Sequence, residues 1–311
     1  VTPRQREVLL LYYAEQLNTR QIGEKLGVDK STVARTIKRG EARLRRCLGE
    51  RRIGHAGTLD PMATGVLPVF VGRATRAVEF ASESEKEYIA GLKLGVVTNT
   101  QDTTGQVVEE RPVEADRADL EGALAAFRGE ITQIPPMYSA IKREGKKLYE
   151  LARKGREVER KPRAITIHSL EVEGQESATD FLIRVRCSKG TYVRTLCHDI
   201  GQALGCGGTM FSLRRTMAAG FSLEQALPLE QVLSHPEPHS LLLPVDTYFQ
   251  DRPPLTLPPA LEKKVRNGMV FPLPGTAEGE YRVYGEDGGF LALSRVRQGV
   301  LTTVKSFFEV T

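Results

Sequence analysis

The stretch of the chain that most restricts its fold runs from Gly54 to Pro68, where three glycines and two prolines fall within fifteen residues. Glycine weakens regular elements and proline interrupts them, so this stretch is predicted to be a loop rather than one continuous helix or strand. The loop fixes His55 and Asp60 five residues apart. Because Asp60 precedes Pro61, its backbone favours an extended conformation that can present the carboxylate to a cleft. Taken alone, an aspartate in such a turn is more often a cap than a reactive group.

Beyond this loop, strand and helix patterns mix without regular alternation. Strands are expected at 88–94, 164–173 and 181–187, and helices at 117–127, 145–154 and 191–204. An irregular mixture of this kind favours an α+β fold over a doubly wound one. A proline-rich segment over 228–259 predicts a domain boundary near residue 250. After it, two strand patterns around the glycine-rich turn at 285–289 indicate a small β-rich domain that continues to residue 311.

The first 48 residues have a different pattern, that of three short helices. Thr2-Pro3-Arg4-Gln5 is a capping-box pattern with proline at the first helical position. The third helix would turn Val33 and Ile37 inward and expose polar and basic side chains: Lys30, Ser31, Thr32, Arg35, Thr36 and Lys38. This arrangement is typical of a helix-turn-helix, whose last helix enters the major groove of DNA, and it resembles the DNA-binding region of sigma-factor-like regulators. A three-helix bundle that does not bind DNA is the alternative.

Positive charge is concentrated in two separate segments. Residues 1–52 hold 13 Lys/Arg against 6 Asp/Glu, and residues 142–163 hold 10 against 4, whereas the whole chain has a net charge of only +5. Two such segments favour two surfaces that contact polyanions. A solvated helix face would explain either segment alone equally well.

Other features of the sequence point to a reduced, cytoplasmic protein. Cys47, Cys187, Cys197 and Cys206 form no CxxC pair and have no spacing suited to zinc, which predicts free thiols. No apolar run is long enough to cross a bilayer, and the beginning of the chain lacks the layout of a secretory signal. We therefore expect no contact with membranes.

Several motifs resemble, in the same order, those of the TruB family of tRNA pseudouridine synthases. They are the Gly54–Pro68 loop, Lys86-Glu87-Tyr88, and the segments 92–105, 133–142, 145–149, 188–196 and 213–215. The resemblance extends from about Leu48 to the end of the chain. It implies two domains behind the predicted helix-turn-helix of 1–48: an α+β catalytic domain with a mixed sheet over 49–250, and a PUA-like RNA-binding domain over 251–311.

The family's reaction, which the resemblance implies for this chain, isomerises a uridine in the T-loop of tRNA to pseudouridine. The bond between ribose C1′ and the base nitrogen breaks, the base turns, and it is rejoined through C5. No redox step or external group is needed, so neither a cofactor nor a metal is implied. Asp60 matches the family's essential aspartate, whose carboxylate attacks C1′ or assists departure of the uracil. The sequence leaves both of these possibilities open.

The resemblance also implies the residues around the base. Arg194 matches the arginine that pairs with the aspartate, although a surface salt bridge is the alternative. A stacked uridine must be extracted before it can react. Tyr88 matches the tyrosine that stacks on the extracted base and relays the C5 proton, and Tyr192 and Leu213 match residues that line the uracil pocket.

Further residues match positions outside the pocket centre. His55 matches the loop histidine that takes the space of the extracted nucleotide, and Asp102 either orders the pocket or only caps a turn. The basic segment 142–163 coincides with an insertion that closes over the T-arm, which predicts phosphate contacts by Lys142, Lys146 and Lys147. The partner is therefore expected to be the tRNA T-arm, bound by a monomer.

The sequence departs from the family ahead of the loop, where the helix-turn-helix stands in place of the usual first strand and its Lys-Pro-x-Gly-x-Thr-Ser turn. Loss of that strand would expose a sheet edge and remove support from the catalytic loop. We therefore expect lowered stability and weak activity. The competing hypothesis is a DNA-binding protein that carries an inactive RNA-binding domain.

Overall fold

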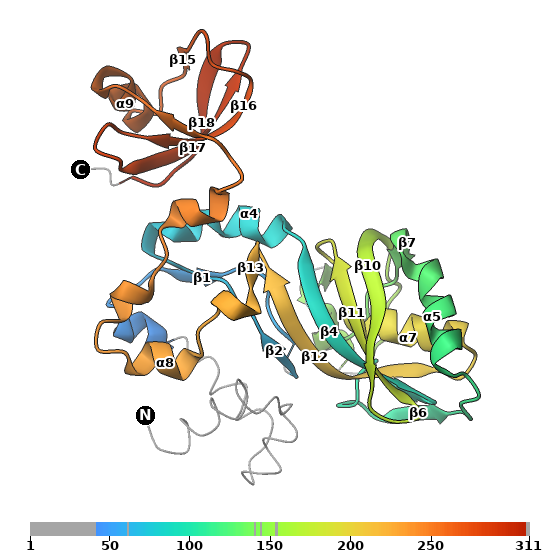
Figure 1. The fold of residues 1–311 in the computed structure, drawn as a ribbon. Coiled ribbons are helices and arrows are strands. Elements are labelled where there is room, and N and C mark those ends of the chain that lie inside the picture. Colours follow the sequence, from blue (N-terminus) through green and yellow to red (C-terminus); the bar gives the residue numbers. More distant parts are fainter. Residues whose placement is uncertain (1–41, 61, 140, 144, 153–154, 309–311) are drawn as a thin grey trace. The chain divides into compact units, whose positions relative to one another are not determined.

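The computed structural model describes residues 42–60, 62–139, 141–143, 145–152 and 155–308 (Figure 1). Residues 1–41 of the predicted helix-turn-helix, with all of its DNA-contacting residues, lie outside these ranges. The described residues divide into two compact units, of which the first draws on 57–67 and 82–230, and the second on 42–56, 68–81 and 231–308. Each unit is thus assembled from segments that are distant in sequence, and the linear boundaries at residues 48 and 250 stay predictions.

The first unit is built on a seven-stranded sheet with the order β13-β12-β4-β11-β10-β7, and β2 pairs with β12 in parallel. The strands are β2 (Ala63–Gly65), β4 (Lys86–Leu94), β7 (Gly129–Gln133), β10 (Arg163–Gln175), β11 (Asp180–Cys187), β12 (Gly208–Ala218) and β13 (Phe221–Ser222). The other neighbours along this order are antiparallel. β12 pairs with β4 and also with β13 and β2, so the sheet edge that loss of the usual first strand was expected to expose does not lie at β12. The lowered stability expected from that loss stays a prediction.

Alternation along the strands gives this sheet one apolar and one charged face. In β11, Phe181, Ile183 and Val185 are fully buried, whereas Arg184 between them donates to Glu87 at 2.7 Å and to Glu173 at 2.5 Å. The helices α5 (Arg117–Leu124) and α7 (Val193–Ala203) pack against the sheet (Figure 1), and the 3-10 turn η2 (Ala125–Phe127) extends α5. The α+β prediction and all of its strands are thus confirmed, as are two of its three helices.

The helix predicted at 145–154 was wrong in its first turn. Gly145 adopts a φ of 80°, which L side chains resist, and the chain turns there to pair β8 (Lys142–Arg143) with β9 (Lys146–Lys147). The helix α6 (Leu148–Ala152) begins only after this hairpin. A second hairpin in the same unit pairs β5 (Val96–Thr98) with β6 (Val107–Glu110).

The second unit contains a five-stranded sheet with the order β14-β16-β17-β18-β15. Its elements are β14 (Pro254–Thr256), α9 (Pro259–Arg266), β15 (Phe271–Pro272), β16 (Gly279–Tyr284), β17 (Phe290–Arg297) and β18 (Val300–Ser306). The predicted β-rich region and the hairpin between β16 and β17 are confirmed. Phe290 stacks on Phe307 with their ring centroids 5.2 Å apart, and Phe249 lies 5.7 Å from Phe307.

Earlier segments of the chain complete the second unit. They are β1 (Ile53–His55), β3 (Val69–Val71), the 3-10 helix η1 (Gly72–Ala77), α4 (Val78–Glu83), α8 (Leu229–Ser234), η4 (Pro238–Leu241) and η5 (Val245–Phe249). The last two residues of α4 and the first two of α8 belong to the first unit. The strands β1 and β3 pair antiparallel. Arg76 then donates to the carbonyl oxygen of Ser306 at 2.8 Å, and Lys305 pairs with Glu79 at 2.5 Å, which joins this region to β18.

The cysteines behave as predicted. All four, each within the described residues, are free thiols. Burial raises the pKa of Cys187 to about 11 and that of Cys197 to about 12, so both remain protonated and unreactive at neutral pH. Within the described ranges, no helix combines the length and apolar character that a bilayer crossing needs.

Candidate active site

The loop that carries Asp60 is fastened to the central sheet by β2. Ala63 pairs with Leu213, and Gly65 with Arg215, in parallel register. The amide of Ala63 donates to the carbonyl oxygen of Asp60 at 2.9 Å, which closes a turn around the aspartate. Gly65 has a φ of 99°, and a Cβ on it would lie 2.1 Å from the carbonyl oxygen of Arg215. Only glycine fits this position. Gly65 therefore allows the loop to pack closely against the backbone of β12.

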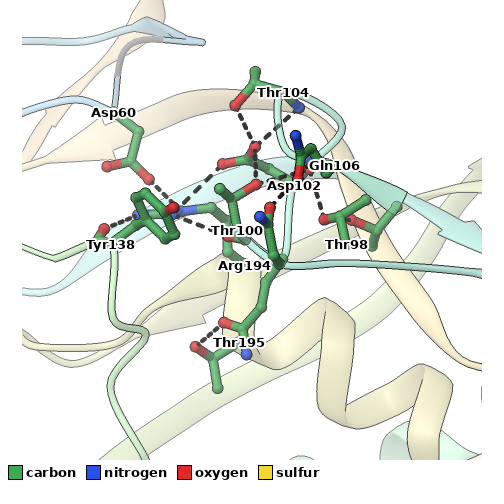
Figure 2. Close-up of polar contacts among 12 residues, drawn as sticks. Asp60, Thr98, Thr100, Asp102, Thr104, Gln106, Tyr138, Arg194 and Thr195 are labelled. Carbon is green, nitrogen blue, oxygen red and sulfur yellow. Dashed lines mark hydrogen bonds and ion pairs between the residues drawn. The ribbon is translucent and has the colours of Figure 1, made fainter. Parts of the chain in front are cut away.

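Arg194 and Asp60, 134 residues apart, meet at the centre of the first unit (Figure 2). The Nε of Arg194 donates to Oδ2 of Asp60 at 2.8 Å. Its Nη1 and Nη2 donate to the carbonyl oxygens of Thr100 and Tyr138 at 3.2 and 3.1 Å. The arginine side chain is 7% exposed and that of the aspartate 39%, so the pair is not a surface salt bridge. The guanidinium is fixed from three sides, and the carboxylate faces accessible space.

Asp102 also lies beside the guanidinium of Arg194 (Figure 2). Its Oδ1 accepts hydrogen bonds from the hydroxyl of Thr100 at 2.8 Å and from the amide and hydroxyl of Thr104 at 3.0 and 2.5 Å. Its Oδ2 lies 3.5 Å from Nη1 of Arg194. Asp102 therefore caps a turn and also places a buried carboxylate beside the arginine, while its role in ordering the pocket stays a prediction.

Tyr192 is held where helix α7 begins. It is the N-cap residue of α7, two positions before Arg194. The side-chain amide of Gln133, which is 2% exposed at the end of β7, donates to the carbonyl oxygen of Tyr192 at 3.2 Å and accepts from its amide at 3.0 Å. The side chain of Gln133 therefore satisfies both main-chain groups of Tyr192, as a neighbouring strand would. Gln133 lies in the motif at 133–142, but nothing in that motif predicts this contact.

Tyr88 and Leu213 come from neighbouring strands, β4 and β12. Burial raises the pKa of Tyr88 to about 12, the Arg215 guanidinium opposes this rise, and the charge of Asp60 adds to it. Burial likewise raises the pKa of Tyr192, which also feels the charges of Asp60 and Arg194. The charge of Asp60 therefore acts on the pKa of both tyrosines.

Leu213 is part of the apolar core of the first unit. It is 7% exposed and belongs to the core cluster against which Leu59 and Tyr88 pack. His55 lies on β1 in the second unit, so its predicted role stays a prediction. Lys142, Lys146 and Lys147 lie on the β8–β9 hairpin, and their RNA contacts also stay predictions.

The mixed sheet of the first unit is the pseudouridine synthase fold. The candidate site on it contains a buried arginine and an accessible carboxylate. A solved Cbf5-Nop10-Gar1 complex contains a chain of this fold, with a TM-score of 0.66 and 24% identity over 86% of this chain and 80% of that chain. Residues 45–193 match the N-terminal domain of TruB family pseudouridylate synthases, and residues 194–250 match the C-terminal domain of tRNA pseudouridylate synthase B.

Relatives of known name agree with these matches. The tRNA pseudouridine synthase B of Azoarcus sp. (strain BH72) is 46% identical over 259 residues, which cover 83% of this chain and 86% of the relative. That of Syntrophomonas wolfei is 45% identical over 248 residues, which cover 78% and 83%. The chain belongs to the TruB family of pseudouridylate synthases. Residues 1–44 match sigma-70, region 4.

Proposed function

We propose that this chain is a cytoplasmic isomerase that converts the T-loop uridine of tRNA to pseudouridine. The observation that carries the proposal is the Asp60–Arg194 pair, in which the arginine is buried and the carboxylate is accessible to substrate. The bond from C1′ to N1 breaks, a bond from C1′ to C5 forms, the C5 proton is lost and N1 gains a proton. Atoms and electrons balance without a cofactor, and side chains are sufficient for every step.

Each side chain of the site has a part in this proposal. The Asp60 carboxylate attacks C1′ or assists departure of the uracil, and the hydrogen bond from Arg194 holds that carboxylate directed at the substrate. Tyr88 stacks on the extracted base, and Tyr192 and Leu213 line the space around it. His55 takes the place that the base leaves in the RNA.

The basic hairpin supports RNA as the substrate. In its register, Lys142 lies opposite Lys147 and Arg143 opposite Lys146. Like charges directly opposite one another destabilise a strand pair, so this arrangement is favourable when a polyanion lies against it. A cavity of about 240 Å³ in the same region is lined by Pro135, Ile141, Leu148, Glu159, Arg160, Lys161 and Arg163, three of which are cations. We propose that both features contact phosphates of the T-arm.

The test is incubation of the purified chain with T-arm RNA, followed by chemical mapping of pseudouridine. Conversion is expected, with an affinity that falls as salt rises. Replacing Lys142, Lys146 and Lys147 together by alanine should lower the salt slope by up to about 2.7, since each phosphate contact contributes about 0.7 to 0.9. The matched replacement of all three by arginine should retain the slope. An active chain with an unchanged slope in the alanine variant would remove the hairpin from the RNA interface, and an inactive chain would refute the proposed reaction.

Tyr88→Phe separates stacking from proton transfer. The ring remains, so the Kd for T-arm RNA should stay within about threefold, whereas loss of the hydroxyl should lower the turnover of saturated RNA about 100-fold. Because burial raises the pKa of Tyr88 to about 12, its hydroxyl stays protonated below about pH 11, and no tyrosine titration should appear in the parent pH profile up to pH 10. Tyr281→Phe serves as the control, because Tyr281 is also partly buried but lies in the second unit. Parent-like turnover in Tyr88→Phe would leave Tyr88 with a stacking role alone.

A second function is favoured by the match of residues 1–44 to sigma-70, region 4. We propose that this segment binds duplex DNA through Lys30, Ser31, Thr32, Arg35 and Lys38, and that the chain is a monomer. Simultaneous Arg35→Ala and Lys38→Ala should weaken a DNA gel shift without changing pseudouridine formation. A shift that survives both changes would contradict this assignment.

A further inference from the structure

Arg215, on strand β12, is a buried cation to which the sequence motifs assign no role. It is the largest fully buried side chain among the described residues, at 1% exposure. Its Nε donates to the carbonyl oxygen of Val66 at 2.7 Å, and its Nη2 to that of Gly57 at 2.9 Å. In the part of the chain that the structure describes, no carboxylate lies within ion-pair distance of it. A buried charge compensated by carbonyl groups alone contributes little net stability, so a functional reason for its presence is expected.

The two carbonyl groups that Arg215 binds lie on either side of Asp60. Gly57 precedes the aspartate by three residues and Val66 follows it by six. The amide of Val66 also donates to the main-chain oxygen of Arg215 at 2.9 Å, so Val66 is held by both the backbone and the side chain of one residue. A Cβ on Gly57 would lie 3.1 Å from Nη1 of Arg215, which shows how closely the loop covers the guanidinium. Arg215 therefore spans the base of the loop that presents the catalytic carboxylate.

The same guanidinium lies near Tyr88, a second side chain of the candidate site. Arg215 and Tyr88 are direct partners in the antiparallel register of β12 and β4, so their side chains lie on the same face of the sheet. The positive charge of Arg215 opposes the rise in the tyrosine pKa that burial causes. One side chain thus hydrogen-bonds to the loop of Asp60 at two points and lies beside the tyrosine across the strands.

We propose that Arg215 is a positioning residue for the isomerisation, which fixes the Asp60 loop through Gly57 and Val66 and sets the position of Tyr88, its partner across the strands, against the same uridine. This inference rests on the proposed function. It requires a planar cation with several donors, because a lysine ammonium is a single point that cannot meet both carbonyl groups in the same geometry. It further requires that loss of Arg215 slow the reaction of bound RNA rather than only unfold the protein.

The experiment uses the full chain with Arg215→Lys and Arg215→Gln, and Arg184→Lys as the control. Arg184 lies on the opposite face of the same sheet and pairs with Glu87 and Glu173. Single-turnover conversion of saturating T-arm RNA is measured per bound complex, so the rate does not depend on the fraction of protein that is folded. Thermal unfolding and the Kd for RNA are recorded beside it.

For Arg215→Lys we expect a fall of at least about 30-fold in the single-turnover rate, with the Kd within about threefold of the parent. Arg184→Lys should leave the rate unchanged even if it lowers the melting temperature. In a Tyr88→Phe background the effect of Arg215→Lys should shrink, because part of it acts through the hydroxyl. A parent-like rate in both Arg215 variants, or failure of both to fold, would assign Arg215 to stability alone and overturn the proposal. An inactive parent would refute the proposed function instead, so the two failures are distinguishable.

Discussion

Asp60→Asn is expected to abolish pseudouridine formation while the protein still folds and binds T-arm RNA. Asparagine has the same shape, but its neutral amide neither attacks C1′ nor stabilises positive charge that develops there. We expect turnover to fall by at least about 1,000-fold, which corresponds to about 4 kcal/mol in the barrier. Conversion of saturating RNA by the variant and the parent, followed by chemical mapping, measures this directly.

The fold should tolerate Asp60→Asn because Arg194 keeps its other partners. The carbonyl oxygens of Thr100 and Tyr138 still accept from its Nη atoms, and Asp102 lies 3.5 Å away. Asp116→Asn is the matched control, since Asp116 caps helix α5 away from the site. It should change stability by less than about 1 kcal/mol at unchanged turnover, because asparagine caps a helix about as well as aspartate and only the charge at the helix N-terminus is lost. Substantial conversion by Asp60→Asn would contradict the assigned chemistry, whatever the family of the chain.

Arg194→Gln is expected to cause the second largest effect, on both activity and stability. The change removes the positive charge between Asp60 and Asp102 and leaves the carbonyl oxygens of Thr100 and Tyr138 with fewer donors. Removing one member of a buried ion pair typically costs about 3–5 kcal/mol, and turnover should fall at least about 100-fold because the carboxylate is no longer held. Urea unfolding measures the first quantity and single-turnover kinetics the second.

Two further variants locate the cause of the loss in Arg194→Gln. Arg194→Lys retains the charge but not the forked donors that meet Asp60, Thr100 and Tyr138 together, so it should regain stability more than activity. In an Asp60→Asn background, Arg194→Gln should have little further effect on turnover, since the two residues act as a unit. Additive losses would instead mean that the arginine contacts the substrate by itself.

Local patterns in the sequence were sufficient for most individual elements. Alternating apolar residues placed β4, β10 and β11, and the helical patterns placed α5 and α7 within a few residues of their ends. The pattern failed at 145–147, where the φ of Gly145 turns the chain into a hairpin. Hydrophobic periodicity reports which face of an element is buried, and it is blind to a single glycine that adopts a left-handed conformation.

The sequence by itself determined the family, the α+β class, and the identity of Asp60 and Arg194 as candidates, because ordered motifs and short-range periodicity are local properties of the chain. Only the tertiary structure decided which groups hold those candidates in place. Gln133 meets Tyr192 across 59 residues and Arg215 meets Gly57 across 158. Such contacts depend on the register of β12 against β4 and β2 and on the pairing of β7 with β10, and these are set by the packing of the whole sheet rather than by neighbouring residues.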